Sequence, residues 1–390
     1  MNRFRMLDQL LNRFTETMLP GCACIVSRHG KVLYEGYSGW ANLEQGKPIT
    51  PDTVYRLFSM TKVIVCTAAL MLYERGKFLL NEPLTEYFPE FEGPMVIRTR
   101  PDGGIDYEPA RNPILIKHLF TMTSGIPYNF GDSEPERLIR QVLDELRAKY
   151  GNYDLQTEVR EMAKAKIPLA FEPGTRWMYG YSHDILGALI EVVSGKKLGQ
   201  FLQEEIFDPL GMKDTGYRFK GDIAERMASV YERTADGKLV EIPGPLDMLH
   251  HPESKYEGGG IGLYSTARDY AVFTQMLACG GVYNGERIIG RKTIELMRRN
   301  HLNEQQMNDF ARAQHAGYGY GLGVRTLVDP AASGSNSSIG EFGWSGLAGT
   351  WTSIDPDEGV SVVFMQQIFP TIFEESVHLR VRNVAYACID

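Results

Sequence analysis

The first residues of the chain alternate apolar and polar positions with the spacing of an α-helix. The apolar positions recur every three or four residues: Phe4, Leu7, Leu11, Phe14 and Met18. We predict an amphipathic helix that packs on the body of the protein. A helix lying on a membrane surface is the alternative, but the acidic residues Asp8 and Glu16 would oppose binding to anionic lipid.

The next segments predict a β-hairpin followed by a helix. Residues 22–40 contain an apolar strand, a turn at Arg28–Lys31 and a second strand at Val32–Tyr37. Residues 60–75 then follow an apolar helical pattern that stops at Gly76. Further helical patterns interrupted by Pro and Gly cover 114–123, 134–149, 154–166 and 184–193.

The residues after Gly258 return to strand patterns. They predict one helix, two apolar strands and a terminal helix, at 266–279, 349–354, 359–366 and 372–387. An order of strands, then helices, then strands indicates the α+β class. We therefore expect two lobes: an α/β lobe built from both chain ends, and a mainly helical lobe from the middle of the chain. The expected boundaries are 1–58 with 200–390 for the first lobe, and 59–199 for the second.

Composition and charge exclude several classes of protein. The 390 residues carry 41 Lys and Arg against 49 Asp and Glu, a net charge of −8, without a dense basic run. We therefore expect no nucleic-acid partner. No stretch of about 18 apolar residues occurs, so we expect no membrane span and no membrane partner. The N-terminus lacks the apolar core and cleavage site of a secretory signal, which favours a cytoplasmic protein.

The cysteines do not form the pattern of a disulfide framework, because they are odd in number and scattered: Cys22, Cys24, Cys66, Cys279 and Cys388. Cys22 and Cys24 share one face of the first predicted strand, but no His or Cys partner for a zinc ion is near them in sequence. We expect buried free thiols in a reducing cytoplasm, and no metal site.

Several catalytic and binding motifs are absent. The nucleophile pattern G-x-S-x-G has two near misses, Gly343–Leu347 and Gly180–Asp184, and each lacks the final glycine. The zinc pattern H-E-x-x-H does not occur. Gly258–Gly262 satisfies neither phosphate-loop pattern, so we interpret it as a tight turn that enters a strand.

The pattern S-x-x-K occurs twice, and its two copies have different surroundings. Ser59 opens an apolar helix, so Lys62 would be buried on the same helix face, within reach of the serine hydroxyl. Burial can hold such a lysine partly neutral, so that it acts as a base. Ser194 instead ends an amphipathic helix that Gly195 caps, and we predict that this copy is structural.

The flanks of Ser59 resemble the serine β-lactamase and penicillin-binding-protein superfamily. The similar segments occur in the order of that superfamily: Val54–Lys62, His118–Ile126, Phe171–Thr175 followed by Tyr179, and Gly258–Thr266. The resemblance covers residues 10–385, which we interpret as one catalytic domain. It implies a β-lactamase/transpeptidase-like fold, with an antiparallel sheet flanked by the terminal helices and an all-helical lobe.

The resemblance also implies a catalytic group of Ser59, Lys62 and Tyr179. Tyr181 competes with Tyr179 for the second motif, Y-x-N, but counting from Pro173 and from Gly187 favours Tyr179. In the family's manner, the oxyanion would be held by the backbone N–H groups of Ser59 and Leu347. The remaining residues of the two motifs would contact substrate: Tyr181, Trp344, Ser345 and Gly346.

Two departures from the β-lactamases suggest a preference for esters. Trp344-Ser345-Gly346 stands where those enzymes have K-T-G or H-T-G, and Tyr181 stands where they have asparagine. This combination resembles the family VIII carboxylesterases, which act on esters of small acids. The alternative role for Trp344 is a plain packing residue.

The function expected from the sequence is therefore a serine carboxylesterase for short-chain or small-acid esters. It would act through an acyl-enzyme on a small-molecule ester or amide, without metal or cofactor. A β-lactamase or D-amino-acid peptidase is the alternative within enzymes, and a non-catalytic binding protein on a hydrolase fold is the alternative outside them. We expect the walls of the pocket in the loops 86–112, 127–157 and 240–257. Aromatic residues in these loops are candidates to line it: Tyr107, Tyr128, Phe130, Tyr153 and Tyr256.

Overall fold

The centre of the fold is an antiparallel β-sheet assembled from both ends of the chain. The computed structural model describes residues 3–313, 316–371 and 374–389. Among these residues the main sheet has eight strands, in the order β12-β13-β14-β15-β16-β1-β2-β3. The strands are β1 (Gly21–Arg28), β2 (Lys31–Asn42), β3 (Lys47–Pro48), β12 (Tyr318–Tyr320), β13 (Arg325–Leu327), β14 (Phe342–Gly343), β15 (Trp351–Asp355) and β16 (Val360–Met365).

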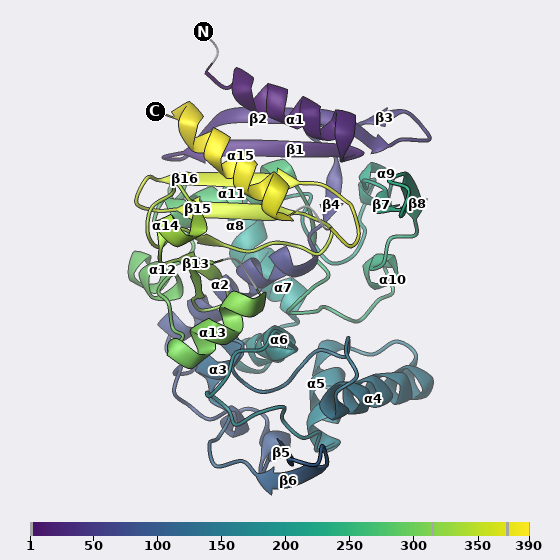
Figure 1. The fold of residues 1–390 in the computed structure, drawn as a ribbon, viewed down its shortest axis with the longest axis vertical. Helices are drawn as coiled ribbons and strands as arrows, with labels where there is room; N and C mark the ends of the chain where they lie inside the picture. Colours follow the sequence, from purple (N-terminus) through teal and green to yellow (C-terminus); the bar gives the residue numbers. More distant parts are fainter. Residues whose placement is uncertain (1–2, 314–315, 372–373, 390) are drawn as a thin grey trace.

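Helices cover both faces of this sheet. Figure 1 shows α1 (Arg5–Thr17) and α15 (Glu374–Ile389) together over one face, while α11 (Ala267–Ala278) packs against β1, β15 and β16 from the other. Strand β1 is therefore buried on both sides, which explains its nearly continuous apolar sequence. Its side chains alternate between two cores: Cys22 and Cys24 pack under the terminal helices, whereas Ala23 and Ile25 face the interior of the molecule.

The middle of the chain supplies most of the remaining helices. They are α2 (Thr61–Glu74), α3 (Ile116–Phe120), α4 (Glu134–Tyr150), α5 (Leu155–Lys164), α6 (Ser182–Ser194), α7 (Leu198–Leu202), α8 (Asp208–Leu210), α9 (Ile223–Arg226) and α10 (Asp247–His250). Three more, α12 (Arg291–Met297), α13 (Glu304–Ala313) and α14 (Pro330–Ser333), lie between the later strands. Figure 1 shows α4 and α5 near the end of the molecule that is remote from α1.

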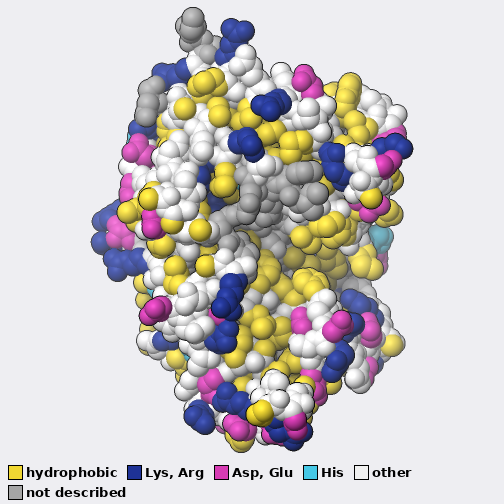
Figure 2. All heavy atoms as spheres, in the orientation of Figure 1, with side chains coloured by type: hydrophobic (Ala, Val, Ile, Leu, Met, Phe, Trp, Pro, Cys, Tyr) yellow, Lys and Arg dark blue, Asp and Glu magenta, His cyan; other side chains and the backbone are white. Residues whose placement is uncertain are grey.

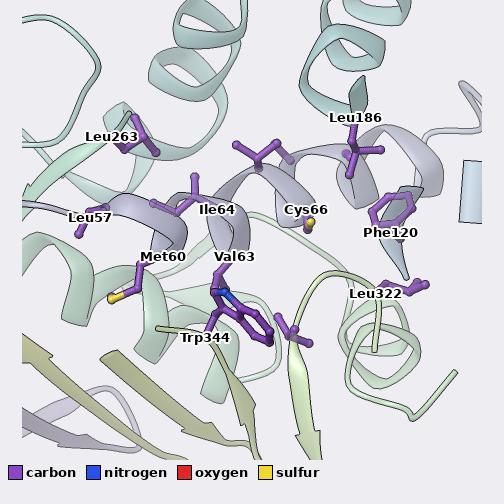
Figure 3. Packing of buried hydrophobic residues seen from close by; sticks show 14 of the residues in the cluster. Leu57, Met60, Val63, Ile64, Cys66, Phe120, Leu186, Leu263, Leu322 and Trp344 are labelled. Atoms are coloured by element: carbon purple, nitrogen blue, oxygen red, sulfur yellow. The ribbon is translucent and has the colours of Figure 1, made fainter. Parts of the chain in front are cut away.

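Helix α2 is the most enclosed of the long helices. Every residue from Thr61 to Leu72 is buried, as the lack of a polar stripe in this segment requires. Figure 3 shows α2 side chains among residues of other elements: Phe120, Leu186, Leu263, Leu322 and Trp344. Because α2 begins next to Ser59, this packing fixes the position of the predicted nucleophile.

The expectation of an all-helical second lobe needs a correction. Strands β5 (Met95–Thr99) and β6 (Ile105–Pro109) form a hairpin within it. Only Val96 of this hairpin is fully buried, and its outer face carries exposed ion pairs such as Arg98–Glu108. The only apolar run of the hairpin is Met95–Ile97, and β6 is exposed throughout, so hydrophobic periodicity did not reveal it. Three small sheets complete the strands: β4 (Val54–Arg56) with β9 (Tyr264–Thr266), β7 (Val230–Arg233) with β8 (Leu239–Ile242), and β10 (Val282–Tyr283) with β11 (Glu286–Arg287).

Most of the predicted elements are confirmed, with shifted ends. Helix α1 buries Leu7, Leu11 and Phe14 as expected, and the predicted first hairpin is β1–β2, although β2 runs on to Asn42. Of the predicted helix at 372–387, the first two residues lie outside the described part of the chain. The two lobe boundaries stay a prediction.

Two further expectations concern free thiols and the absence of a membrane span. All five thiols are free, and four are buried, while Cys279 is half-buried. No helix in the described ranges is both long and apolar enough to cross a membrane.

Candidate active site

The predicted nucleophile, Ser59, lies where the chain passes from β4 into α2. Residues 58–60 form a short 3₁₀ turn immediately before the helix. Phe58 in this turn has a left-handed backbone, with φ of 47°, and its ring stacks on Phe369 at 5.4 Å. Bulky residues rarely adopt this conformation, so packing must hold it. Ser59 is thereby presented, half-buried, at the beginning of α2.

Lys62 lies one turn further along α2 and is fully buried. Its Nζ donates hydrogen bonds to Ser59 Oγ at 3.1 Å and to the carbonyl oxygen of Gly260 at 2.7 Å. Nζ also lies 4.7 Å from the ring centroid of Tyr179 and 5.5 Å from that of Tyr128. Aromatic faces attract a nearby cation, so both rings interact favourably with the charged form of this side chain.

Tyr179 completes a contact triangle around the serine. Its hydroxyl donates to Ser59 Oγ at 2.7 Å, and Trp344 Nε1–H donates to the same hydroxyl at 3.3 Å. The ring of Tyr179 stacks on Trp344 at 5.7 Å and on Trp177 at 6.4 Å. These neighbours hold the phenol in one orientation. The predicted trio of Ser59, Lys62 and Tyr179 is thus brought together by segments more than a hundred residues apart.

Tyr181 does not take part in this triangle. It directly precedes α6, its ring packs edge-on against Tyr128 at 4.8 Å, and its hydroxyl donates to Asn129 Oδ1 at 3.4 Å. Burial raises the pKa of its phenol well above the ordinary value. The geometry therefore favours Tyr179 over Tyr181 as the tyrosine that contacts the serine.

Residues 344–347 form the turn on the other side of Ser59. The Gly346 N–H donates a hydrogen bond to the carbonyl oxygen of Thr350 at 2.8 Å, and Ser345 forms an isolated antiparallel β-bridge with Trp351. Trp344 is only 4% exposed, and its ring stacks on Tyr179 at 5.7 Å and meets Tyr320 edge-on at 5.2 Å. Whether it contacts substrate or only packs stays a prediction. Leu347 is 45% exposed, and among the described residues its N–H has no protein acceptor. An oxyanion hole formed by Ser59 and Leu347 stays a prediction.

The structure adds a buried polar group that the sequence did not single out. Asp184 on α6 is 2% exposed, and its Oδ1 accepts a hydrogen bond from Gly260 N–H at 2.9 Å. Burial raises the pKa of Asp184, while the charge of Lys62 and nearby backbone amides oppose this. His183 beside it is fully buried, and burial lowers its pKa to about 3, so it is neutral. The only sequence signal was that both residues lie in the incomplete motif Gly180–Asp184.

The second copy of S-x-x-K lies outside this site. Gly195 ends α6 in the left-handed conformation, as expected of a cap. Lys196 pairs with Glu204 at 2.5 Å and Lys197 with Asp154 at 2.5 Å. In the described chain neither lysine side chain contacts Ser194 Oγ, which accepts a hydrogen bond from the backbone N–H of Lys196 at 3.2 Å.

Aromatic residues of the expected pocket loops differ in their relation to the site. Tyr128 contacts Tyr179 at 5.4 Å, and Phe130, 79% exposed, stacks on Tyr128 at 5.1 Å. Tyr153 and Tyr256 instead contact each other, and Tyr107 is exposed and bonded to Glu134. Figure 2 shows hydrophobic side chains gathered around mid-height of the face that it draws.

The helix-covered antiparallel sheet, with a half-buried S-x-x-K serine beside a tyrosine, defines the β-lactamase/transpeptidase-like class. A family model described as Beta-lactamase matches residues 7–387. The chain therefore belongs to the β-lactamase family.

Individual relatives agree with this assignment. The chain is 31% identical to the esterase EstB of Burkholderia gladioli, over 97% of this chain and 93% of that protein. Among solved structures, EstCE1, described as a hydrolase with promiscuous acyltransferase activity, has a TM-score of 0.81 at 26% identity, covering 99% and 98% of the two chains. Simvastatin synthase (LovD) of Aspergillus terreus has a TM-score of 0.84 at 23% identity, covering 100% and 99%, and this likeness concerns the fold alone.

Proposed function

We propose that this protein is a serine hydrolase that cleaves carboxylic esters of small or short-chain acids through an acyl-enzyme on Ser59. The observation that carries the proposal is the position of Ser59 Oγ, which is hydrogen-bonded to both Lys62 Nζ at 3.1 Å and Tyr179 OH at 2.7 Å. A nucleophile in direct hydrogen-bond contact with two side chains through which its proton can move is the arrangement that covalent catalysis requires.

In the proposed mechanism, Lys62 and Tyr179 share the task of removing the proton from Ser59. Ser59 Oγ then attacks the ester carbonyl, and the backbone N–H groups of Ser59 and Leu347 stabilise the oxyanion. Tyr179 returns a proton to the leaving alkoxide, which departs as the alcohol. Water then attacks the acyl-enzyme, releases the acid and restores Ser59.

The surroundings of Tyr179 support esters over β-lactams. Trp344 supplies a neutral N–H at 3.3 Å from Tyr179 OH, at the motif position where lactamases place a cation. A neutral indole cannot grip a carboxylate as a charged side chain does. EstB and the lovastatin esterase of Penicillium rubens, 32% identical over 66% of this chain, are both named esterases. The β-lactamase or peptidase alternative is supported by a putative D-alanyl-D-alanine carboxypeptidase of Escherichia coli, 24% identical over 93% of this chain.

The test is the substitution Ser59→Ala, assayed on a series of p-nitrophenyl esters and on nitrocefin. We expect at least about a 10³-fold loss of kcat for esters, because the covalent route disappears. A fluorophosphonate probe should label the wild-type protein and not Ser59→Ala, whereas the matched variant Ser194→Ala should be labelled and active. Unchanged ester hydrolysis by Ser59→Ala contradicts the proposal. Nitrocefin turnover exceeding that of every ester favours the lactamase alternative, and absence of labelling favours a binding protein.

Two accompanying proposals concern context. Tyr181, Ser345 and Gly346 would border the substrate, and a series of esters graded by acyl length measures the size of that space. We also propose a cytoplasmic location, which the free and mostly buried thiols support.

A further inference from the structure

Asp184 is a buried carboxyl that the mechanism above does not use. Its Oδ1 accepts from Gly260 N–H at 2.9 Å, and the carbonyl of the same Gly260 accepts from Lys62 Nζ at 2.7 Å. A side-chain carbon on Gly260 would lie 2.7 Å from Asp184 Oδ2 and 3.2 Å from Lys62 Nζ. Gly260 therefore joins the carboxyl to the ammonium group in a tightly packed arrangement.

Asp184 is the buried carboxyl whose charge is coupled to Lys62, because the attraction of Lys62 opposes the rise that burial gives to the pKa of Asp184. The titratable side chains that face Lys62 in the described chain come from α2 itself, from two neighbouring loops and from α6: Cys66, Tyr128, Tyr179, His183 and Asp184. Burial raises the pKa values of Cys66 and Tyr128 and lowers that of His183 to about 3, so these three are neutral near neutral pH. The Tyr179 hydroxyl is bonded to Ser59. Behind Asp184, Glu158 on α5 is a further buried carboxyl that interacts with it.

We propose that Asp184 is a positioning residue that acts on Lys62 through Gly260. By holding the Gly260 N–H, it keeps the Gly260 carbonyl against Nζ and so directs Nζ at Ser59 Oγ. During acylation the proton of Ser59 passes to Nζ, and the carboxylate of Asp184 balances the ammonium that forms. A buried cation without such a counter-charge is strongly disfavoured. This inference rests on the serine hydrolase function proposed above.

The substitution Asp184→Asn tests the charge separately from the hydrogen bond, because the amide oxygen still accepts from Gly260 N–H. We expect kcat for a p-nitrophenyl ester to fall about 10- to 100-fold, with KM changed by less than about 3-fold. The ascending limb of kcat/KM against pH should move to lower pH, because the ammonium at Nζ is less stable without the carboxylate. Asp184→Glu keeps the charge and should keep the position of this limb.

Glu257→Gln is the matched control. Glu257 directly precedes the same glycine-rich turn, is 3% exposed, and accepts from Gly199 N–H at 2.7 Å, so it also anchors the segment with a buried carboxylate. Its partner is Arg218 at 2.5 Å and not Lys62. We expect Glu257→Gln to leave the pH limb in place and to cost less than about 3-fold in kcat.

The outcomes separate this inference from the proposed function. The role of Asp184 is overturned if Asp184→Asn has the kcat and the pH profile of the wild type. It is also overturned if Glu257→Gln shifts the ascending limb of the pH profile as much as Asp184→Asn does. If circular dichroism shows that Asp184→Asn is unfolded, Asp184→Ser and Asp184→Glu take its place in the test. The ascending limb of kcat/KM against pH should then shift only in Asp184→Ser. The same limb position in both variants overturns the inference. Full activity of Ser59→Ala overturns the function itself, independently of Asp184.

Discussion

The pattern S-x-x-K occurs at both ends of a helical layer, and the two copies have opposite properties. At the first copy, Lys62 is fully buried and its Nζ lies 3.1 Å from Ser59 Oγ. At the second, Lys197 has a half-exposed side chain, and its Nζ is paired with Asp154, the residue that caps α5. Helix α6 connects the two regions: its first turn carries Asp184 beside Lys62, and it ends at Ser194.

The difference lies in the backbone between the serine and the lysine. From Ser59 to Lys62 the chain is helical throughout, so both side chains lie on one face. Between Ser194 and Lys197, Gly195 has a φ of 72° and ends the helix. The side chains of Ser194 and Lys197 therefore do not lie on one helix face. Equal spacing therefore gives a reactive pair only where a buried helix continues through the motif.

Replacing the lysine of each S-x-x-K copy tests most directly whether the two copies differ in function. We expect Lys62→Met to lower kcat/KM for an ester by about 10²- to 10⁴-fold, the usual contribution of a general base. Lys197→Met should change it by less than about 2-fold, because an exposed ion pair contributes little. Steady-state kinetics on both variants measures this, and equal losses would show that the two copies do not differ in function.

A second test uses Glu158 on α5 and Asp154, which caps the start of α5. Glu158 interacts with Asp184 near the first copy, whereas Asp154 pairs with Lys197 of the second. Burial, with a smaller contribution from Asp184, raises the pKa of Glu158 to about 7. Protonation is thus favoured in the folded state, so the stability that this group contributes is full below about pH 4.5 and lost as the pH rises through about 7. Relative to wild type, Glu158→Gln should gain up to about 3 kcal/mol in free energy of unfolding between these limits.

Asp154→Asn provides the control, because we expect the opposite dependence of stability on pH for Asp154. Partial burial opposes the effect, but hydrogen bonds from Lys197 and Thr157 lower the pKa of Asp154. Wild type should therefore lose stability relative to Asp154→Asn as the pH falls through this lowered pKa. Urea unfolding across the acid and neutral range measures both variants, and parallel curves for Glu158→Gln and wild type would contradict the expectation.

The variant Trp344→Phe tests how much the hydrogen bond to Tyr179 contributes to the site around Ser59 and Lys62. It keeps a ring against Tyr179 but removes the Nε1–H that donates to Tyr179 OH, so we expect a loss of about 3- to 10-fold in kcat. Trp177→Phe is the matched variant, because Trp177 stacks on the same phenol and its Nε1 has no hydrogen-bond partner. Its kcat should change less than that of Trp344→Phe, and the reverse order would assign the effect to stacking.

The smallest effect concerns the end of α6. Gly195→Ala places a side chain at a left-handed position, where it costs about 1 kcal/mol. No neighbouring atom lies within 4 Å of the added carbon, so the cost comes from the backbone alone. Thermal unfolding should show this loss while ester hydrolysis stays at the wild-type level, and a fall in activity would connect the second copy to the site after all.

Much of the fold could be predicted because its signals are local. The stripe of Leu7, Leu11 and Phe14 predicted α1, and the wholly apolar segment after Ser59 predicted the buried helix α2. The hairpin β5–β6 could not be found in this way, because β6 is exposed throughout and the apolar run of β5 is only three residues long. Ser59, Lys62 and Tyr179 were found from motifs, whereas Asp184 was missed, since no motif marks a carboxyl that acts through a backbone amide.

The sequence by itself determined the family of the chain, and it predicted the nucleophile and the contrast between the two S-x-x-K copies, because these depend on order and spacing along the chain. Only the tertiary structure decided that Tyr179, rather than Tyr181, contacts Ser59. It also decided that Trp344 bonds to Tyr179, and that Gly260 stands between Lys62 and Asp184. Such contacts join segments up to nearly 200 residues apart, and the packing that selects them is a property of the whole core.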